Sequence, residues 1–468
     1  METPNASAVP RLRRTLTLWD LIFYGIVLIQ PIAPVPLYGV AQKLSDGHFV
    51  TIILIALFAM LITAVSYGRM GALYPTAGSA YTYVGKGLNP HLGFLAGWAM
   101  ILDYLLQPLI NTVWISITLH DRYAYFHIPP IRFEVWALII ATIMTALNLA
   151  GVKASANANK VLLAVMSVVV VFFIVLAVKF LYGGQGWAGL FSLEPIYNPK
   201  TFNPKILPSA ISFAALTYIG FDGVTTLAED VENPKRNVLL AVVLTCIFAG
   251  VCSAVEAYLG ARIWPDWRSF PSLESSFVDI CARVGGLVLS WSMALILVVA
   301  AFGSGLTGTL GAARLLFGMG RDGVLPKKFF GKLSARTNTP TNNILLIGGL
   351  SFVGAVLLNS PWITRHGSGA YEHAAELLNF GAFLAFMGVN FACFWQFSIA
   401  FQSGFKRNLV RDMILPLIGF VCCFYIWWNL NHLAKIVGGI WFAIGILYVG
   451  YKTNWFRSAP VMIDFSDS

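Results

Sequence analysis

Asp222 carries the clearest chemical signal in this sequence, because it stands between two glycines inside an apolar stretch. The segment SFAALTYIGFDGVTTLAED, residues 212–230, places Gly220 and Gly223 on either side of it. A carboxylate at the centre of a bilayer costs about 2.5–3.5 kcal/mol, and such residues are usually functional. Asp222 is therefore a candidate for holding an ammonium group or a proton. The alternative is a structural hydrogen bond that ties down an unwound turn.

Four other polar or aromatic side chains suit the same chemistry. Asp103 lies near the middle of a long apolar stretch, beside Tyr104. It could carry a proton or pair with a cation, or it could simply bond neighbouring helices. Tyr218 and Phe221 flank Asp222, where their rings could close over a ligand.

A second unusual stretch is LIQPIAPVPLYG, residues 28–39, which holds three prolines. Each proline lacks a backbone N–H and interrupts a helix. An unwound backbone at membrane depth is tolerated only where it is buried in protein or lines a wet cavity. The stretch therefore predicts a helix break that exposes polar backbone to a ligand, and a plain proline kink is the alternative.

The composition explains why these stretches should lie in a membrane. Of the 468 residues, 57% are hydrophobic and 11% are charged, whereas soluble domains have about 25% charged residues. We therefore predict an all-α polytopic membrane protein with the lipid bilayer as its main solvent. The net charge of +10 comes from residues between apolar stretches, without a basic stripe among stacking aromatics, so no nucleic-acid partner is expected.

A membrane span needs about 20 apolar residues. We predict twelve transmembrane helices, at residues 18–42, 50–70, 91–119, 134–152, 160–182, 207–228, 237–261, 285–317, 342–359, 374–398, 412–430 and 435–453. Residues 1–17 and 454–468 are expected to be cytoplasmic tails. Basic residues concentrate between alternate spans, for example Arg11, Arg13 and Arg14, which favours cytoplasmic placement of both termini. The expected location is the cell (inner) membrane, in a multi-pass arrangement.

The two interrupted spans, the first and the sixth, are about 190 residues apart, and each opens a block of five spans. An odd number of spans reverses orientation, so the blocks 18–182 and 207–398 are expected to form an inverted repeat. Spans 11 and 12, residues 412–453, lie outside it. Interrupted segments at matching positions are typical of a transporter's binding site.

Three long stretches resemble one family of membrane proteins. They are YPTAGSAYTYVGKGLNPHLGFLAGWAMILDYLLQPLIN (74–111), YIGFDGVTTLAEDVENPKRN (218–237) and GAARLLFGMGRDGVLP (311–326). The chain is similar, over roughly residues 11–455, to the amino acid–polyamine–organocation (APC) superfamily of transporters. It looks closest to the branch of bacterial putrescine importers and amino-acid permeases. In that branch the importers have an acidic residue aligned with Pro36, and its absence from this chain counts against a diamine substrate. Many permeases have a glycine-rich turn in this break, where this chain has prolines.

The resemblance implies a LeuT-like 5+5 inverted repeat with discontinuous helices 1 and 6, and a substrate site between them. It also implies alternating access by rocking of a helix bundle. The substrate-binding residues it implies are Pro31, Ile32, Ala33, Pro34, Val35, Pro36, Tyr104, Tyr218, Ile219, Gly220, Phe221, Asp222 and Gly223. Asp222 and Asp103 are the expected proton-coupling or ion-pairing residues.

The chemistry of the first break does not decide whether the ligand is an amino acid or a diamine. We expect the second half-helix of span one to start near Pro34, with its positive end favouring a carboxylate. The prolines leave the N–H groups of Ile32, Ala33, Val35 and Leu37 as donors, and carbonyls outnumber them. That excess favours an ammonium group. An amino acid would use both kinds of group, and a diamine mainly the carbonyls.

Other classes of function fit less well. The segment GSAYTYVGKG (78–87) has the wrong spacing for a phosphate-binding loop and lacks Ser or Thr after Lys86. The seven histidines and six cysteines form no H-E-x-x-H or metal-ligand pattern, so no metal, cofactor or enzymatic activity is expected. We expect a secondary transporter that imports a small amine or amino acid with H+ as the coupling ion. The alternatives are an exchanger of the same fold and, from other classes, a channel or a membrane enzyme.

Overall fold

The computed structural model describes residues 16–76, 78–121, 131–150, 152–273, 275–321, 323–334, 339–361, 370–400 and 408–458. Within these ranges the chain is helical, and its only β-type pairing is an isolated bridge between Leu16 and Val231. The prediction of an all-α protein is confirmed. The predicted tails fall largely outside the described residues, at 1–15 and 459–468.

The elements follow in chain order. They are α1 (Leu18–Ile29), α2 (Tyr38–Leu44), α3 (Phe49–Leu73), α4 (Ser79–Gly87), α5 (Pro90–Asp121), α6 (Phe133–Ala150), α7 (Val152–Leu190), α8 (Leu207–Ala214), η1 (Ala215–Tyr218), η2 (Phe221–Asp230), α9 (Pro234–Ile263), η3 (Trp267–Ser269), α10 (Ser276–Arg321), α11 (Lys327–Phe330), α12 (Thr341–Leu358), α14 (Ala370–Trp395), η4 (Gln396–Ala400), η5 (Val410–Ile414), α15 (Leu415–Trp428) and α16 (His432–Lys452).

Eleven segments in the described residues are long and apolar enough to cross a membrane. They coincide, within several residues at most boundaries, with predicted spans two to twelve. The predicted first span corresponds to α1, a break and α2, and neither half alone is long enough to cross, so the full count of twelve stays a prediction. Large apolar side chains point outward from the outer helices, as with Val168 and Val171 on α7, which are 68% and 58% exposed. Lipid is the solvent that such a surface requires.

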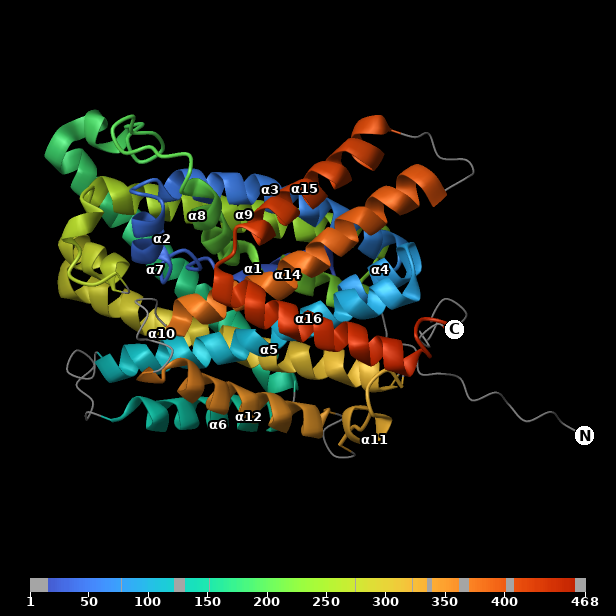
Figure 1. Ribbon diagram of the computed structural model, residues 1–468. Helices are drawn as coiled ribbons and strands as arrows, with labels where there is room; N and C mark the ends of the chain where they lie inside the picture. Colours follow the sequence, from blue (N-terminus) through green and yellow to red (C-terminus); the bar gives the residue numbers. More distant parts are fainter. Residues whose placement is uncertain are drawn as a thin grey trace, which may run out of the picture.

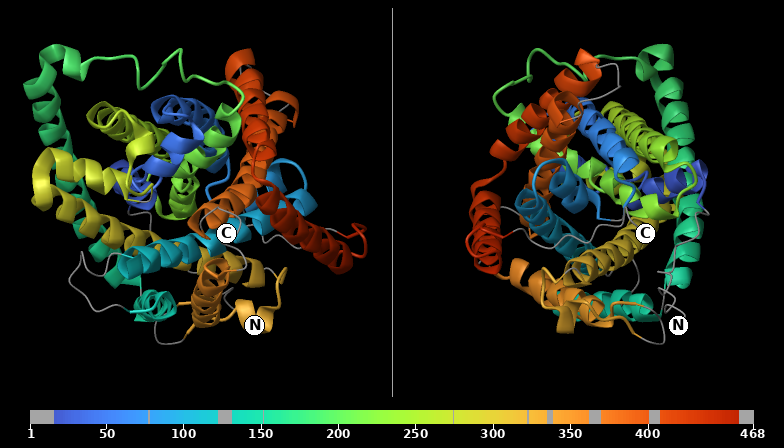
Figure 2. Two further views of the ribbon diagram at one scale, coloured as in Figure 1. Left: turned by 60° about the vertical axis from the view of Figure 1, so that its left-hand side comes forward. Right: turned by 90° about the vertical axis from the view of Figure 1, so that its right-hand side faces the viewer.

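The helices sort into two packed groups (Figures 1 and 2). One group, which we call the bundle, contains α1, α3, η2 and α9, and these elements contact one another. The other, the scaffold, contains α5, α6, α10 and α12. Contacts between the groups are fewer than contacts within them. Counterparts from the two predicted repeats pack together, since α3 lies along α9, α5 along α10 and α6 along α12.

The first break follows the end of α1 at Ile29. Gln30 there has φ 72° and ψ 130°, a backbone region that residues other than glycine rarely adopt and that costs on the order of 1–3 kcal/mol. The next helix, α2, begins at Tyr38 rather than near Pro34 as expected. The segment between them makes tight turns because the three prolines cannot donate to a helical hydrogen-bond ladder.

The second break lies in the predicted sixth span. Here α8 tightens into the 3₁₀ turn η1, Ile219 is extended, and Gly220 has φ 120°. The chain then continues as the 3₁₀ segment η2 instead of an α-helix. Glycine is needed at position 220 because its φ lies where a Cβ is strained. Both predicted discontinuities are therefore present in the fold.

Candidate substrate site

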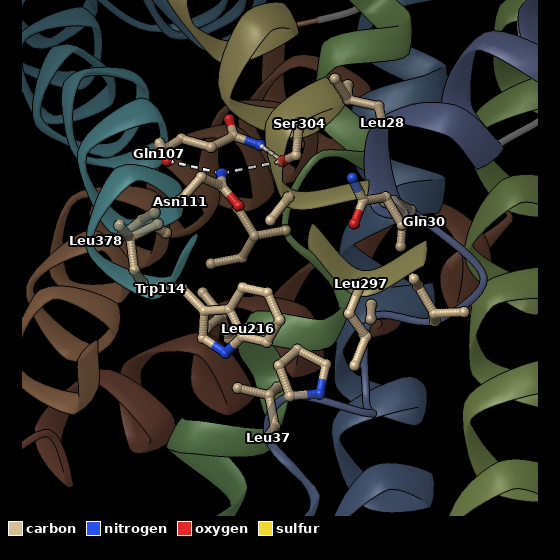
Figure 3. A pocket seen from close by; sticks show the side chains of 17 residues that line it. Leu28, Gln30, Leu37, Gln107, Asn111, Trp114, Leu216, Leu297, Ser304 and Leu378 are labelled. Carbon is tan, nitrogen blue, oxygen red and sulfur yellow. Dashed lines mark hydrogen bonds between the residues drawn. The ribbon is translucent and has the colours of Figure 1, made fainter. Parts of the chain in front are cut away.

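A cavity of about 100 Å³ lies beside the first break, between the bundle and the scaffold (Figure 3). The first break, α5, α10 and the second break supply most of its wall. Its polar lining residues are Gln30, Gln107, Asn111 and Ser304. Its apolar lining residues are Leu28, Ile29, Ile32, Ala33, Pro36, Leu37, Ile110, Trp114, Leu216, Ile219, Leu297, Ala301 and Leu378.

The four polar residues form what we call the amide wall: Gln30, Gln107, Asn111 and Ser304. Gln107 Nε2 and Asn111 Nδ2 each donate to Ser304 Oγ at 3.3 Å, and Asn111 Nδ2 also donates to the Gln107 carbonyl at 2.8 Å. Gln30 Nε2 donates to the Ala300 carbonyl on α10. Gln30 thus faces Gln107 and Asn111 across the cavity and joins the bundle to the scaffold.

A stripe of glycines on α10 lets the polar face of α5 come close. A Cβ added at Gly308 would lie 3.2 Å from the Gln107 side chain, tighter than an ordinary contact. The pairs along the two helices are Tyr104 with Gly311, Gln107 with Gly308, and Asn111 with Gly305. Residues three and four apart share a helix face, so this stripe holds Tyr104, Gln107 and Asn111 in one row.

Asp222 and Asp103, which we call the carboxylate pair, lie at the other end of that row. They are 1% and 3% exposed, and they interact electrostatically. The Tyr104 hydroxyl donates to Asp222 Oδ2 at 3.1 Å, and the Thr225 hydroxyl donates to the Asp222 carbonyl at 2.6 Å. Neither carboxylate forms an ion pair with a lysine, arginine or histidine of the described chain. A buried charge without a partner is costly, so this pair favours a proton or a cationic ligand.

Two buried polar atoms around the carboxylate pair lack hydrogen-bond partners in the described chain. They are Asp103 Oδ1 and the hydroxyl of Tyr67, and Tyr67 interacts electrostatically with Asp222. Most buried polar atoms in folded proteins are hydrogen-bonded. The surroundings of the pair are therefore equipped to bind a proton, water or a polar ligand.

Leu28 contacts both the cavity and the turn that carries Asp222. It lines the cavity, and a Cβ at Gly220 would lie 3.4 Å from Leu28 Cγ, while one at Gly223 would clash with Leu28 Cδ2. Asp222 itself is not among the described residues that line the cavity.

The structure distributes the predicted site residues over three places. Ile32, Ala33, Pro36 and Ile219 line the cavity; Tyr104, Asp222 and Asp103 form the carboxylate end; Pro31, Pro34, Val35, Gly220 and Gly223 shape the two breaks. Tyr218 donates its hydroxyl to the Ile53 carbonyl at 2.9 Å. Phe221 packs against Tyr67 and Phe386. These last two rings have structural contacts and do not line the cavity.

The N–H groups of the first break are less available than the sequence suggested. Those of Ala33, Val35 and Leu37 donate to carbonyls within the break, at 3.1, 3.0 and 3.2 Å. Among the four expected donors only Ile32 keeps an N–H without an acceptor in the described chain. The break therefore offers a ligand few donors.

Sequence reasoning missed the amide wall and Trp114. A signal was present, because Tyr104, Gln107 and Asn111 recur at the spacing of one helix face within an otherwise apolar span. Ser304 and Gln30 carry no such pattern. Each is a polar residue in a different stretch of the sequence, and only the fold brings them to the same cavity.

Comparisons with known proteins identify the family to which the chain belongs. A family model described as "Amino acid permease" matches residues 35–455. The chain is 32% identical to the low-affinity putrescine importer PlaP of Escherichia coli, covering 97% of each chain. It is 25% identical to the branched-chain amino acid permease BcaP of Lactococcus lactis, covering 94% of each. It is also 24% identical to the methylthioribose transporter of Bacillus subtilis, covering 96% of this chain and 95% of that one.

A solved structure shows the same fold. The manganese transporter of Eremococcus coleocola, in a mutant form, superposes with a TM-score of 0.58 at 11% identity, covering 95% of this chain and 98% of that chain. At that identity the likeness concerns architecture alone. Together with the matched family model and the full-length relatives, it confirms the resemblance seen in the sequence: this chain is a multi-pass membrane protein of the amino acid permease family, within the APC superfamily.

Proposed function

We propose that this protein is a secondary transporter that imports a small amine-bearing solute, an amino acid or a polyamine. The observation that carries the proposal is the carboxylate pair, Asp103 and Asp222, buried beside a helix break without a cationic partner in the described chain. An ammonium group or a proton supplies the missing positive charge. Relatives named as importers of putrescine and permeases of branched-chain amino acids support this class of solute.

The cavity sets the size of the solute. A dry cavity of about 150 Å³ holds benzene, which has six non-hydrogen atoms, so about 100 Å³ corresponds to roughly four non-hydrogen atoms. Small amino acids and short diamines are slightly larger, so their binding requires the cavity to widen. The proposal includes no catalytic step, cofactor or metal.

Movement of the bundle against the scaffold is the proposed transport step. The two groups share fewer contacts than each has within itself, and the cavity lies between them. We place the protein in the cell membrane with both termini in the cytoplasm, and we assign H+ as the coupling ion because Asp103 and Asp222 are the buried ionisable groups beside the site.

The test uses purified protein in liposomes with a more acidic exterior and a panel of labelled diamines and amino acids. We expect at least one of them to accumulate above equilibrium, and a proton ionophore to abolish the accumulation. The variant Asp222→Asn should insert and fold normally but not accumulate the solute. Normal uptake by Asp222→Asn would remove this residue from the mechanism, and no accumulation of any panel member would overturn the proposal.

The exchanger alternative is separated in the same liposomes. An exchanger would need solute preloaded inside and would ignore the ionophore. The symport proposal requires uptake into empty liposomes that depends on the pH gradient.

A further inference from the structure

We infer that the amide wall binds a second N–H-bearing group of the solute, so that the transported molecule is a short linear diamine rather than an α-amino acid. This inference rests on the proposed function and narrows its substrate class. It depends on which hydrogen-bonding groups the cavity offers, which can be counted residue by residue.

The amide wall offers more acceptors than donors. Asn111 uses both of its side-chain N–H groups, and Gln107 and Gln30 use one each. The three amide oxygens accept no hydrogen bond within the described chain. Each oxygen has two lone pairs, so about six acceptor positions face about three remaining hydrogens, counting the Ser304 hydroxyl. An ammonium group, which is all donor, matches such a wall.

A carboxylate has few donors to bind. In the first break three of the four candidate N–H groups already donate to local carbonyls, and only that of Ile32 is left. In the second break the N–H groups of Gly220, Asp222 and Gly223 lie close to the Asp222 carboxylate itself. Neither arginine nor lysine is among the described residues that line the cavity. An α-carboxylate that entered the cavity would therefore lose its hydrogen bonds to water and would find too few N–H donors to replace them.

The spacing of the two ends fits a four-carbon diamine. Tyr104, which holds Asp222, precedes Gln107 by three residues and Asn111 by seven, which is about 4.5 and 10.5 Å along a helix. The nitrogens of an extended four-carbon diamine are about 6 Å apart. One ammonium at the carboxylate pair thus brings the other to the near part of the amide wall.

The surfaces between the two ends suit a methylene chain. Leu28, Ile110, Ile219 and Leu297 line the cavity, and Trp114 adds an aromatic face, which attracts cations as well as apolar groups. Because Leu28 covers the turn with Asp222, entry of the first ammonium moves this side chain, and the diamine's carbons then take up its apolar contacts.

The experiment measures dissociation constants of the purified, detergent-solubilised protein for four probes. They are 1,4-diaminobutane, n-butylamine, 4-aminobutanoate and L-leucine. Butylamine keeps one ammonium and the chain but lacks the second nitrogen. We expect 1,4-diaminobutane to bind roughly 10- to 100-fold more tightly than butylamine, the value of hydrogen bonds to a charged group, and more tightly than either amino acid.

Variants of the amide wall test whether it causes the preference for the diamine over butylamine. In Gln107→Met and Asn111→Leu the preference for the diamine over butylamine should fall to within about threefold. An unchanged midpoint of thermal unfolding shows that each variant is folded. The control variant Gln185→Leu, which replaces an exposed amide near the end of α7, should keep the full preference. If one wall variant fails to fold, the other still decides.

The outcomes separate this inference from the proposed function. Tighter binding of leucine or 4-aminobutanoate than of the diamine would overturn the inference and leave an amine transporter. A full diamine preference in the folded wall variants would also overturn it. Absence of binding by all four probes, together with no uptake in liposomes, would overturn the proposed function and the inference with it.

Discussion

The carboxylate pair and the amide wall meet at α5, which carries Asp103, Gln107 and Asn111, yet the two ends of the site differ in chemistry. The pair has charge and is almost fully buried, with Asp222 on the unwound turn of the bundle and Asp103 on α5 of the scaffold. The wall is neutral, is open to the cavity and belongs mainly to the scaffold helices α5 and α10. One carboxylate thus lies where the backbone is irregular and the other on a regular helix, whereas most of the neutral hydrogen-bonding groups stand on regular helices.

This difference has a physical reason. A charge at membrane depth is expensive, and it is tolerated at the turn because backbone amides and the Tyr104 hydroxyl surround it. Neutral amides cost less, so they can stand on a continuous helix where the glycine stripe of α10 fixes their positions. If the bundle moves relative to the scaffold, Asp222 and Gln30 move relative to the site residues on α5 and α10, and a solute bound to both groups is sensitive to that movement.

The largest expected effect distinguishes the two members of the pair. Asp222 is held by Tyr104 and by the broken turn, whereas Asp103 stands on a continuous helix with one oxygen unpartnered. Asp222→Asn should weaken amine binding by at least about 100-fold, measured by calorimetric titration. Asp103→Asn should bind the amine within a few fold of the native protein but lose accumulation driven by the pH gradient. Equal effects of the two variants would contradict this division.

Tyr104→Phe should have the next largest effect. It removes the hydroxyl that donates to Asp222 Oδ2 and leaves the ring against Gly311. A hydrogen bond to a charged group predicts about tenfold weaker amine binding, equal for mono- and diamines because only the carboxylate end is touched. A selective loss of diamine binding would show that the two ends are not independent.

Gln30→Gly should separate stability from function. Glycine adopts φ 72° without strain, so the midpoint of thermal unfolding should stay the same or rise. The variant loses the bond to the Ala300 carbonyl and one acceptor of the wall, so the preference for diamine over monoamine should fall about threefold to tenfold. A large fall in thermal stability would mean that Gln30 acts chiefly as a structural tie between bundle and scaffold.

The smallest effect is expected for Gly308→Ala. The added Cβ lies 3.2 Å from the Gln107 side chain, so Gln107 shifts by a few tenths of an ångström. Diamine binding should weaken by about twofold to threefold with monoamine binding unchanged. Gly318→Ala on the same helix, where a Cβ meets open space, is the matched control.

Much of the fold could be predicted from the sequence because lipid imposes long apolar helices and because proline and glycine mark the breaks. The carboxylate pair was also visible, since Asp222 and Asp103 are rare residue types at membrane depth. The amide wall was not predicted, because it depends on α5 and α10 approaching along a glycine stripe and on Gln30 adopting a positive φ. The sequence also could not show that the N–H groups of Ala33, Val35 and Leu37, which we expected to be free for a ligand, donate to carbonyls in local turns.

The most direct test is a cryo-electron microscopy structure of the protein in lipid nanodiscs with saturating 1,4-diaminobutane. We predict density for the diamine between the two broken helices, with one nitrogen at Asp222 and the other at Gln107 and Asn111, and with Leu28 displaced. Continuous first and sixth helices, or a ligand bound only outside this cavity, would contradict the account.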